Sequence, residues 1–188
     1  MLERFFKRIE EKSKDNASAP VIIAVLGDSV TQGCMEIDVF DFKHVYHNVL
    51  KELLEKKFPQ ATFSVINGGV GGEDATAGLK RLQRDITSHN PDLVLVGFCL
   101  NDSCGGPERL QNYRNNIKAI FDGVRAGCGA DILALSPNMM ATHPTDNIAE
   151  AHKQFADTII GTQNNGGLKN YVEALKELSA ANGIPVAD

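Results

Sequence analysis

The stretch Val21-Ile-Ile-Ala-Val-Leu-Gly-Asp-Ser29 places six apolar residues in a row directly before a glycine, an acid and a serine. Short runs of this kind, with mostly branched aliphatic side chains, are typical of strands buried on both faces of a parallel sheet. Similar runs recur along the chain, and turn-forming or polar residues follow most of them. We therefore predict five parallel strands, at residues 21–26, 63–66, 93–96, 132–135 and 184–187.

Between these runs, apolar residues recur at the three- and four-residue spacing of amphipathic helices. This spacing predicts helices within residues 2–9, 45–54, 79–86, 110–124 and 148–159, and another within 171–178 after a break at 164–167. Asn182-Gly183 is typical of a helix end. Strands that alternate with helices predict an α/β fold, with three layers (α/β/α) and a flavodoxin-like five-stranded parallel sheet.

Composition narrows the classes of function. The chain carries 19 Lys plus Arg against 24 Asp plus Glu, a net charge of −5. Nucleic acids and anionic membranes attract basic surfaces, so we expect neither as a partner. The aliphatic runs are too short to span a bilayer, and the charged N-terminus lacks a signal-peptide pattern, which favours a cytoplasmic location unless a leader has been removed. We expect reduced thiols at Cys34, Cys99, Cys104 and Cys128, because their spacing fits neither CxxC nor a zinc site.

Three predicted loops at the carboxyl ends of the strands, where open parallel sheets bind ligands, have unusual sequences. Gly27-Asp28-Ser29 puts a serine hydroxyl at this edge, although the same tripeptide also serves as a turn or a helix cap. The second loop, 67–73, has four glycines in five positions, which allows backbone N–H groups to face a ligand such as phosphate, or forms only a flexible turn. In the third, Asn101-Asp102 offers either a side-chain amide or a turn.

In this order and after these strands, the three loops resemble the sequence blocks of the SGNH, or GDSL-type, hydrolase family. The resemblance extends over residues 20–188, includes the stretch 77–82, and leaves 1–19 as an N-terminal helix and linker. It implies that Ser29 is the nucleophile and that Gly72 and Asn101 are oxyanion donors. The Ser29 backbone N–H would be a third donor.

One element of the family pattern has no counterpart. The resemblance implies an Asp-x-x-His after the last strand, and the sequence ends there, at Asp188. We therefore expect the natural protein to continue and to carry this motif. The one Asp-x-x-His present, Asp41 to His44, follows the first predicted strand and not the last. Together with Asp38 and His47, its two residues could imitate a metal site, but their spacing puts the four side chains on different faces of a helix. His143, after the fourth strand, is the alternative base within the chain.

We therefore predict a serine-dependent hydrolase of carboxylic esters that needs no metal or organic cofactor. Carbohydrate deacetylation, lysophospholipase and thioesterase activities all fit, and a small acyl ester is preferred. Phe98, Met139 and Met140 suggest an apolar acyl pocket. The alternatives are a catalytically dead relative, or a flavodoxin-like module that binds an ester, a glycan or a phosphate ligand. The sequence does not indicate an oligomeric state.

Overall fold

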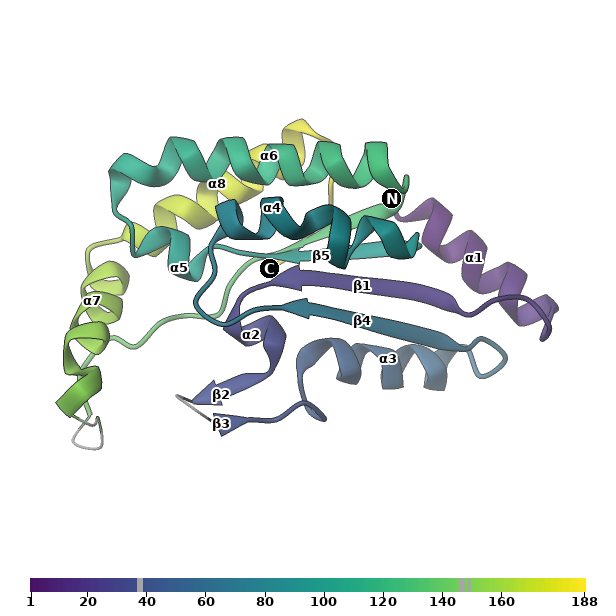
Figure 1. Ribbon diagram of the computed structural model, residues 1–188, viewed down its shortest axis with the longest axis horizontal. Helices are drawn as coiled ribbons and strands as arrows, with labels where there is room; N and C mark the ends of the chain where they lie inside the picture. Colours follow the sequence, from purple (N-terminus) through teal and green to yellow (C-terminus); the bar gives the residue numbers. More distant parts are fainter. Residues whose placement is uncertain (37–38, 146–147, 149) are drawn as a thin grey trace.

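A computed structural model describes residues 1–36, 39–145, 148 and 150–188 (Figure 1). Its central sheet has five parallel strands in the order β4-β1-β5-β6-β7, which is the flavodoxin-like order 2-1-3-4-5 when the strands are numbered along the chain. The predicted fold class is confirmed. The strands are β1 (Val21–Gly27), β4 (Phe63–Gly69), β5 (Leu93–Gly97), β6 (Asp131–Leu135) and β7 (Val186–Ala187).

Two hydrophobic clusters hold helices against the two faces of the sheet. Alternate side chains of β1 enter different clusters: Ala24 and Leu26 face one, and Ile23 and Val25 face the other. The first cluster lies under α4 (Ala75–Asp85), α6 (Leu110–Gly127) and α8 (Gly167–Ala181). The second lies under α1 (Glu3–Lys14) and α3 (Tyr46–Lys57). Because both faces are covered, the central strands have almost no exposed side chains, as their sequence predicts.

Shorter elements gather at the carboxyl ends of the strands (Figure 1). The four-residue helices α2 and α5 follow β1 and β5 directly, and α7 precedes α8. A small antiparallel hairpin, β2–β3, follows α2. The bounds are α2 (Ser29–Gln32), β2 (Cys34–Glu36), β3 (Val39–Phe40), α5 (Leu100–Ser103) and α7 (Lys153–Asn164), with 3-10 turns at Thr87–His89, Pro107–Arg109 and Glu150–His152.

The structure differs from the predicted elements at three places. Asn67, Gly68 and Gly69 continue β4 instead of forming a loop, since they pair with the last residues of β1. The α7 helix begins at Lys153 rather than near Ile148, after a 3-10 turn. The hairpin was not predicted, because its two strands are too short to show an alternating pattern.

The N-terminal helix is packed on the sheet. Phe5 and Ile9 are buried in the second cluster, and the Phe5 N–H donates to the Asp131 carboxylate at 2.9 Å. The boundary between 1–19 and 20–188 stays a prediction. All four cysteines are free thiols, as predicted. Among the described residues, no helix combines the length and the apolar character that a membrane span needs.

Candidate active site

The first site loop is a sharp turn from β1 into α2. Asp28 ends the turn and accepts a hydrogen bond from the Val30 N–H at 3.0 Å, so it caps α2 while Ser29 occupies the first helical position. Gly27 is needed because an added Cβ would lie 2.1 Å from the Thr31 Oγ1. This close packing fixes the half-buried Ser29 at the carboxyl end of β1.

The glycine loop after β4 lies against α2. An added Cβ at Gly69 would be 2.2 Å from the Gln32 backbone nitrogen, and one at Gly71 would be 3.9 Å from the Ser29 Cβ. Gly72 has φ +76°, in the left-handed region that favours glycine, and no other heavy atom of the described chain lies within 4 Å of an added Cβ there. The backbone at Gly72 is therefore open on one side, and the adjacent Gly71 lies close to the serine.

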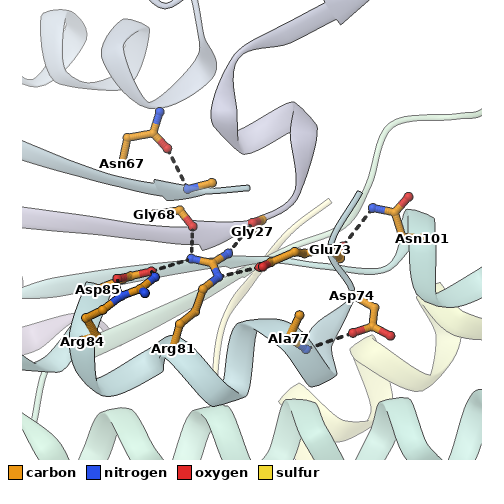
Figure 2. A network of polar contacts seen from close by, with 11 residues as sticks. Gly27, Asn67, Gly68, Glu73, Asp74, Ala77, Arg81, Arg84, Asp85 and Asn101 are labelled. Atoms are coloured by element: carbon orange, nitrogen blue, oxygen red, sulfur yellow. Dashed lines mark hydrogen bonds and ion pairs between the residues drawn. The ribbon is translucent and has the colours of Figure 1, made fainter. Parts of the chain in front are cut away.

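Asn101 connects the third loop to the second. Its Nδ2 donates to the Glu73 carbonyl oxygen at 2.9 Å (Figure 2). The neighbouring Asp102 accepts from the Ala75 N–H at 3.0 Å, at the start of α4. The structure therefore brings the loops of Ser29, Gly72 and Asn101 together, because β4, β1 and β5 are adjacent strands.

A buried arginine holds the strand ends beneath these loops. Arg81, on α4, donates to the carbonyl oxygens of Gly27 at 3.0 Å and Gly68 at 2.5 Å. It also pairs with Glu73 at 2.5 Å and with Asp85 at 3.1 Å (Figure 2). This one side chain thus contacts the ends of two strands and the glycine loop.

Two carboxyl groups at the carboxyl ends of the strands are buried and form no ion pair with any described residue. Burial raises the pKa of Asp28 to about 6, although the Val30 N–H opposes this shift. Burial also raises the pKa of Asp102 to about 7, against the hydrogen bond from Ala75. Among the described residues, the second carboxylate oxygen of Asp102 has no hydrogen-bond partner. Such shifts are frequent at functional sites.

A cavity of about 330 Å³ adjoins the serine loop at the carboxyl ends of four strands. Its wall includes Phe98, as the sequence suggested. The two methionines do not line it: Met140 is buried in the core and Met139 is 71% exposed, so that expectation was wrong. The lining is mostly apolar and comprises Asp28, Val30, Thr31, Tyr46, Gly97, Phe98, Leu100, Leu135, Ser136, Pro137, Asn138, Ala187 and Asp188.

Comparison with known proteins shows the family of the chain. The model of the GDSL-like lipase/acylhydrolase family matches residues 25–188, which include all three loops. The chain belongs to that family.

Proteins similar to this chain include esterases. An arylesterase from Vibrio mimicus is 32% identical over 84 residues, which make up 45% of this chain and only 39% of the arylesterase. A lipase/acylhydrolase from Enterococcus faecalis has a TM-score of 0.63 at 21% identity, covering 89% of this chain and 75% of that one. An acetylxylan esterase from Geobacillus stearothermophilus has a TM-score of 0.65 at 16% identity, covering 91% of this chain and 76% of that one. At these identities the two solved structures show the shared fold.

Among the described residues, no histidine lines the cavity. His47 is only 2% exposed: its Nε2 donates to the Thr31 carbonyl at 3.1 Å, and burial lowers its pKa. His44 pairs with Asp41 at 2.7 Å on an exposed turn, whereas Asp38 lies outside the described residues. His143 is exposed, its Nδ1 lies 3.0 Å from the Thr142 hydroxyl, and it does not line the cavity.

Sequence reasoning assigned no role to Arg81, Glu73 or Asp102. One signal was available, because Arg81 lies three residues after Gly78 and next to Leu82, on the inward side of α4. A charged residue on a buried helix face needs a partner, which indicates a polar contact beneath that helix.

Proposed function

We propose that this protein hydrolyses carboxylic esters through an acyl-enzyme on Ser29. One observation carries the proposal: Ser29 begins α2 beside Gly71, the neighbour of the open Gly72 backbone, and Asn101 is hydrogen-bonded to Glu73 in the same loop. Attack of the Ser29 hydroxyl on an ester carbonyl gives a tetrahedral intermediate with a negatively charged oxygen. Collapse of the intermediate releases the alcohol, and water then releases the acid.

The oxyanion would receive hydrogen bonds from three groups. These are the N–H groups of Ser29 and Gly72 and the side-chain amide of Asn101. One Asn101 N–H already donates to Glu73, so its second N–H is the one assigned to the oxyanion. Donors fixed before the reaction stabilise the developing charge without reorganisation, and the loss of one typically costs about 10²–10³ in turnover.

A serine hydroxyl also needs a base that accepts its proton. We assign this role to the Asp-x-x-His that the family resemblance implies after residue 188, with His143 as the alternative. The last strand ends at the cavity: Ala187 pairs with Leu135, and Asp188 lines the cavity, as Asp28 does.

The cavity supports a small acyl group as substrate. Its volume of about 330 Å³ lies near the lower end of the range for small-molecule sites, and its wall is mostly apolar. Polar groups at Ser136 and Asn138 would face the alcohol part of the ester. The acetylxylan esterase with the same fold makes an acetylated carbohydrate the first substrate to test.

Labelling with a fluorophosphonate, followed by peptide mapping, tests the nucleophile. We expect the adduct on Ser29, and Ser29→Ala should abolish both the adduct and the hydrolysis of short p-nitrophenyl esters. Ser64→Ala is the matched control, because Ser64 is exposed on β4 and is not among the residues that line the cavity. An active protein that labels at another serine while Ser29 stays unmodified would refute the assignment.

A second candidate is a relative that binds esters or glycans without turnover. The observation that favours it is that no histidine is among the described residues that line the cavity. Titration calorimetry with an acetylated oligosaccharide, followed by mass analysis of the ligand, separates the two candidates. Binding with every acetyl group retained would favour the second.

A further inference from the structure

The network around Arg81 does more than neutralise a buried charge. The side chain is only 7% exposed, yet its guanidinium contacts four separate acceptors: the carbonyl oxygens of Gly27 and Gly68 and the carboxylates of Glu73 and Asp85. Two of them are main-chain groups at the ends of β1 and β4, and Glu73 lies in the glycine loop (Figure 2). A planar guanidinium can donate in several fixed directions at once, whereas an ammonium group is a single point charge.

Glu73 is placed between the two assigned oxyanion donors. It directly follows Gly72, its carbonyl oxygen accepts from the Asn101 Nδ2 at 2.9 Å, and its N–H donates to the Val70 carbonyl at 3.4 Å. A shift of the Glu73 main chain would therefore move the Gly72 N–H and the Asn101 amide together. The side-chain contact that opposes such a shift is the ion pair with Arg81.

We propose that the Arg81–Glu73 pair is the positioning element of the oxyanion hole. Through Gly27 and Gly68, Arg81 is fixed to the strand that leads to Ser29 and to its neighbour. Because Glu73 follows Gly72 and accepts from Asn101, its ion pair with Arg81 also holds both donors in place. The inference rests on the proposed function, and it adds two residues that need not contact the substrate.

Two variants and one control test this role. Glu73→Gln removes the charge from a side chain that is only partly buried, so the protein should fold. Arg81→Lys keeps the positive charge but loses the geometry that reaches two carbonyl oxygens and a carboxylate. Arg84→Lys is the control, because Arg84 also pairs with Asp85 but is 76% exposed and has no hydrogen bond to the glycine loop among the described contacts.

The first measurement is the rate of ester hydrolysis and of fluorophosphonate labelling, far below each variant's melting temperature. Oxyanion donors act mainly in the transition state, so kcat should fall by about 10–10² fold in both variants while KM stays within about twofold. The control should match the wild type. A pair that only stabilises the fold would lower the melting temperature and leave kcat unchanged, which would overturn the inference.

The second measurement does not depend on activity. Hydrogen exchange of the peptide that covers residues 70–76 should become faster in Glu73→Gln and Arg81→Lys and stay unchanged in Arg84→Lys. Equal exchange in all four proteins would overturn the inference. A wild-type protein that exchanges as expected but never labels at Ser29 would refute the proposed function instead, and the catalytic part of the inference with it.

Discussion

Buried carboxylates occur at both ends of the central sheet, but only one end provides them with cations. At the amino end, Asp92 is 6% exposed, accepts from the Ile22 N–H at 2.9 Å and faces Arg8 at 3.4 Å and Arg4 at 4.0 Å. At the carboxyl end, Asp28 and Asp102 are equally buried, and neither has an ion-pair partner among the described residues. The nearby guanidinium of Arg81 contacts other groups.

This contrast separates a structural end of the sheet from a functional one. A buried charge without a counter-charge costs stability, and natural sequences keep such groups mostly where function requires them. The amino end joins α1 to the sheet through paired groups, so its substitution should affect folding. Substitution at the carboxyl end should instead affect reactivity or the pH dependence of stability.

The largest expected effect lies at the carboxyl end. Asn101→Ala should lower kcat/KM for a short aryl ester by about 10²–10³, because one oxyanion donor is lost, with little change in the melting temperature. Asn116→Ala is the control, since that amide contacts Thr76 instead. Unchanged rates in a folded Asn101→Ala protein would remove Asn101 from the site and weaken the contrast between the two ends.

Asp102→Asn should change how stability depends on pH. In the folded protein the pKa of Asp102 is raised from 3.8 to about 7, so the folded state holds this proton more strongly than the unfolded state. The free energy of unfolding should therefore decrease as pH rises from about 4 to 7, by up to about 1.4 kcal/mol per unit from this group. Asp102→Asn should remove that part of the slope. Urea denaturation of both proteins at pH 4, 5.5 and 7 measures the difference, and parallel curves would contradict it.

At the amino end, Asp92→Ala should reduce the free energy of unfolding by about 2 kcal/mol, because Ile22, Arg4 and Arg8 lose a buried charged partner. Labelling of Ser29 in the folded fraction should stay at the wild-type rate. Asp122→Ala provides the comparison, since its exposed pair with Lys118 should contribute less than about 1 kcal/mol. A lower rate of Ser29 labelling in folded Asp92→Ala would show that the two ends of the sheet are coupled.

The smallest effect is expected for a neutral contact beside the cavity. Tyr46→Phe removes the 3.0 Å hydrogen bond between the Tyr46 and Thr31 hydroxyl groups, which should cost about 1 kcal/mol of stability. Chemical denaturation measures this loss. A loss as large as that of Asp92→Ala would mean that uncharged groups at the carboxyl end are as important for folding as the ion pairs at the other end.

Much of the fold follows from the periodicity of the sequence. The apolar runs locate all five strands of the sheet, since the side chains of its central strands are covered on both faces and are mostly apolar. The site loops could be predicted for a related reason. Parallel strands bring their carboxyl ends to one edge, so polar and glycine residues after three adjacent strands must lie near one another.

Other features depend on contacts that no local pattern shows. The burial of His47 depends on the position of α2, whose Thr31 carbonyl it contacts, and an amphipathic pattern alone does not reveal this. Gly68 and Gly69 resemble a loop in sequence but continue β4, because their lack of side chains lets α2 and Arg81 approach. The role of Arg81 depends on acceptors up to 54 positions away in the chain.

Three glycines lie side by side across the sheet, since Gly27 is paired with both Gly69 and Gly97. The three positions differ in whether a side chain could be added there. A methyl group at Gly27 or Gly69 would overlap Thr31 or the Gln32 main chain, but one at Gly97 would lie 3.5 Å or more from every described neighbour outside the adjacent residues, on the wall of the cavity. A methyl group could therefore be added to the cavity wall at Gly97, whereas Gly27 and Gly69 admit no side chain unless α2 moves.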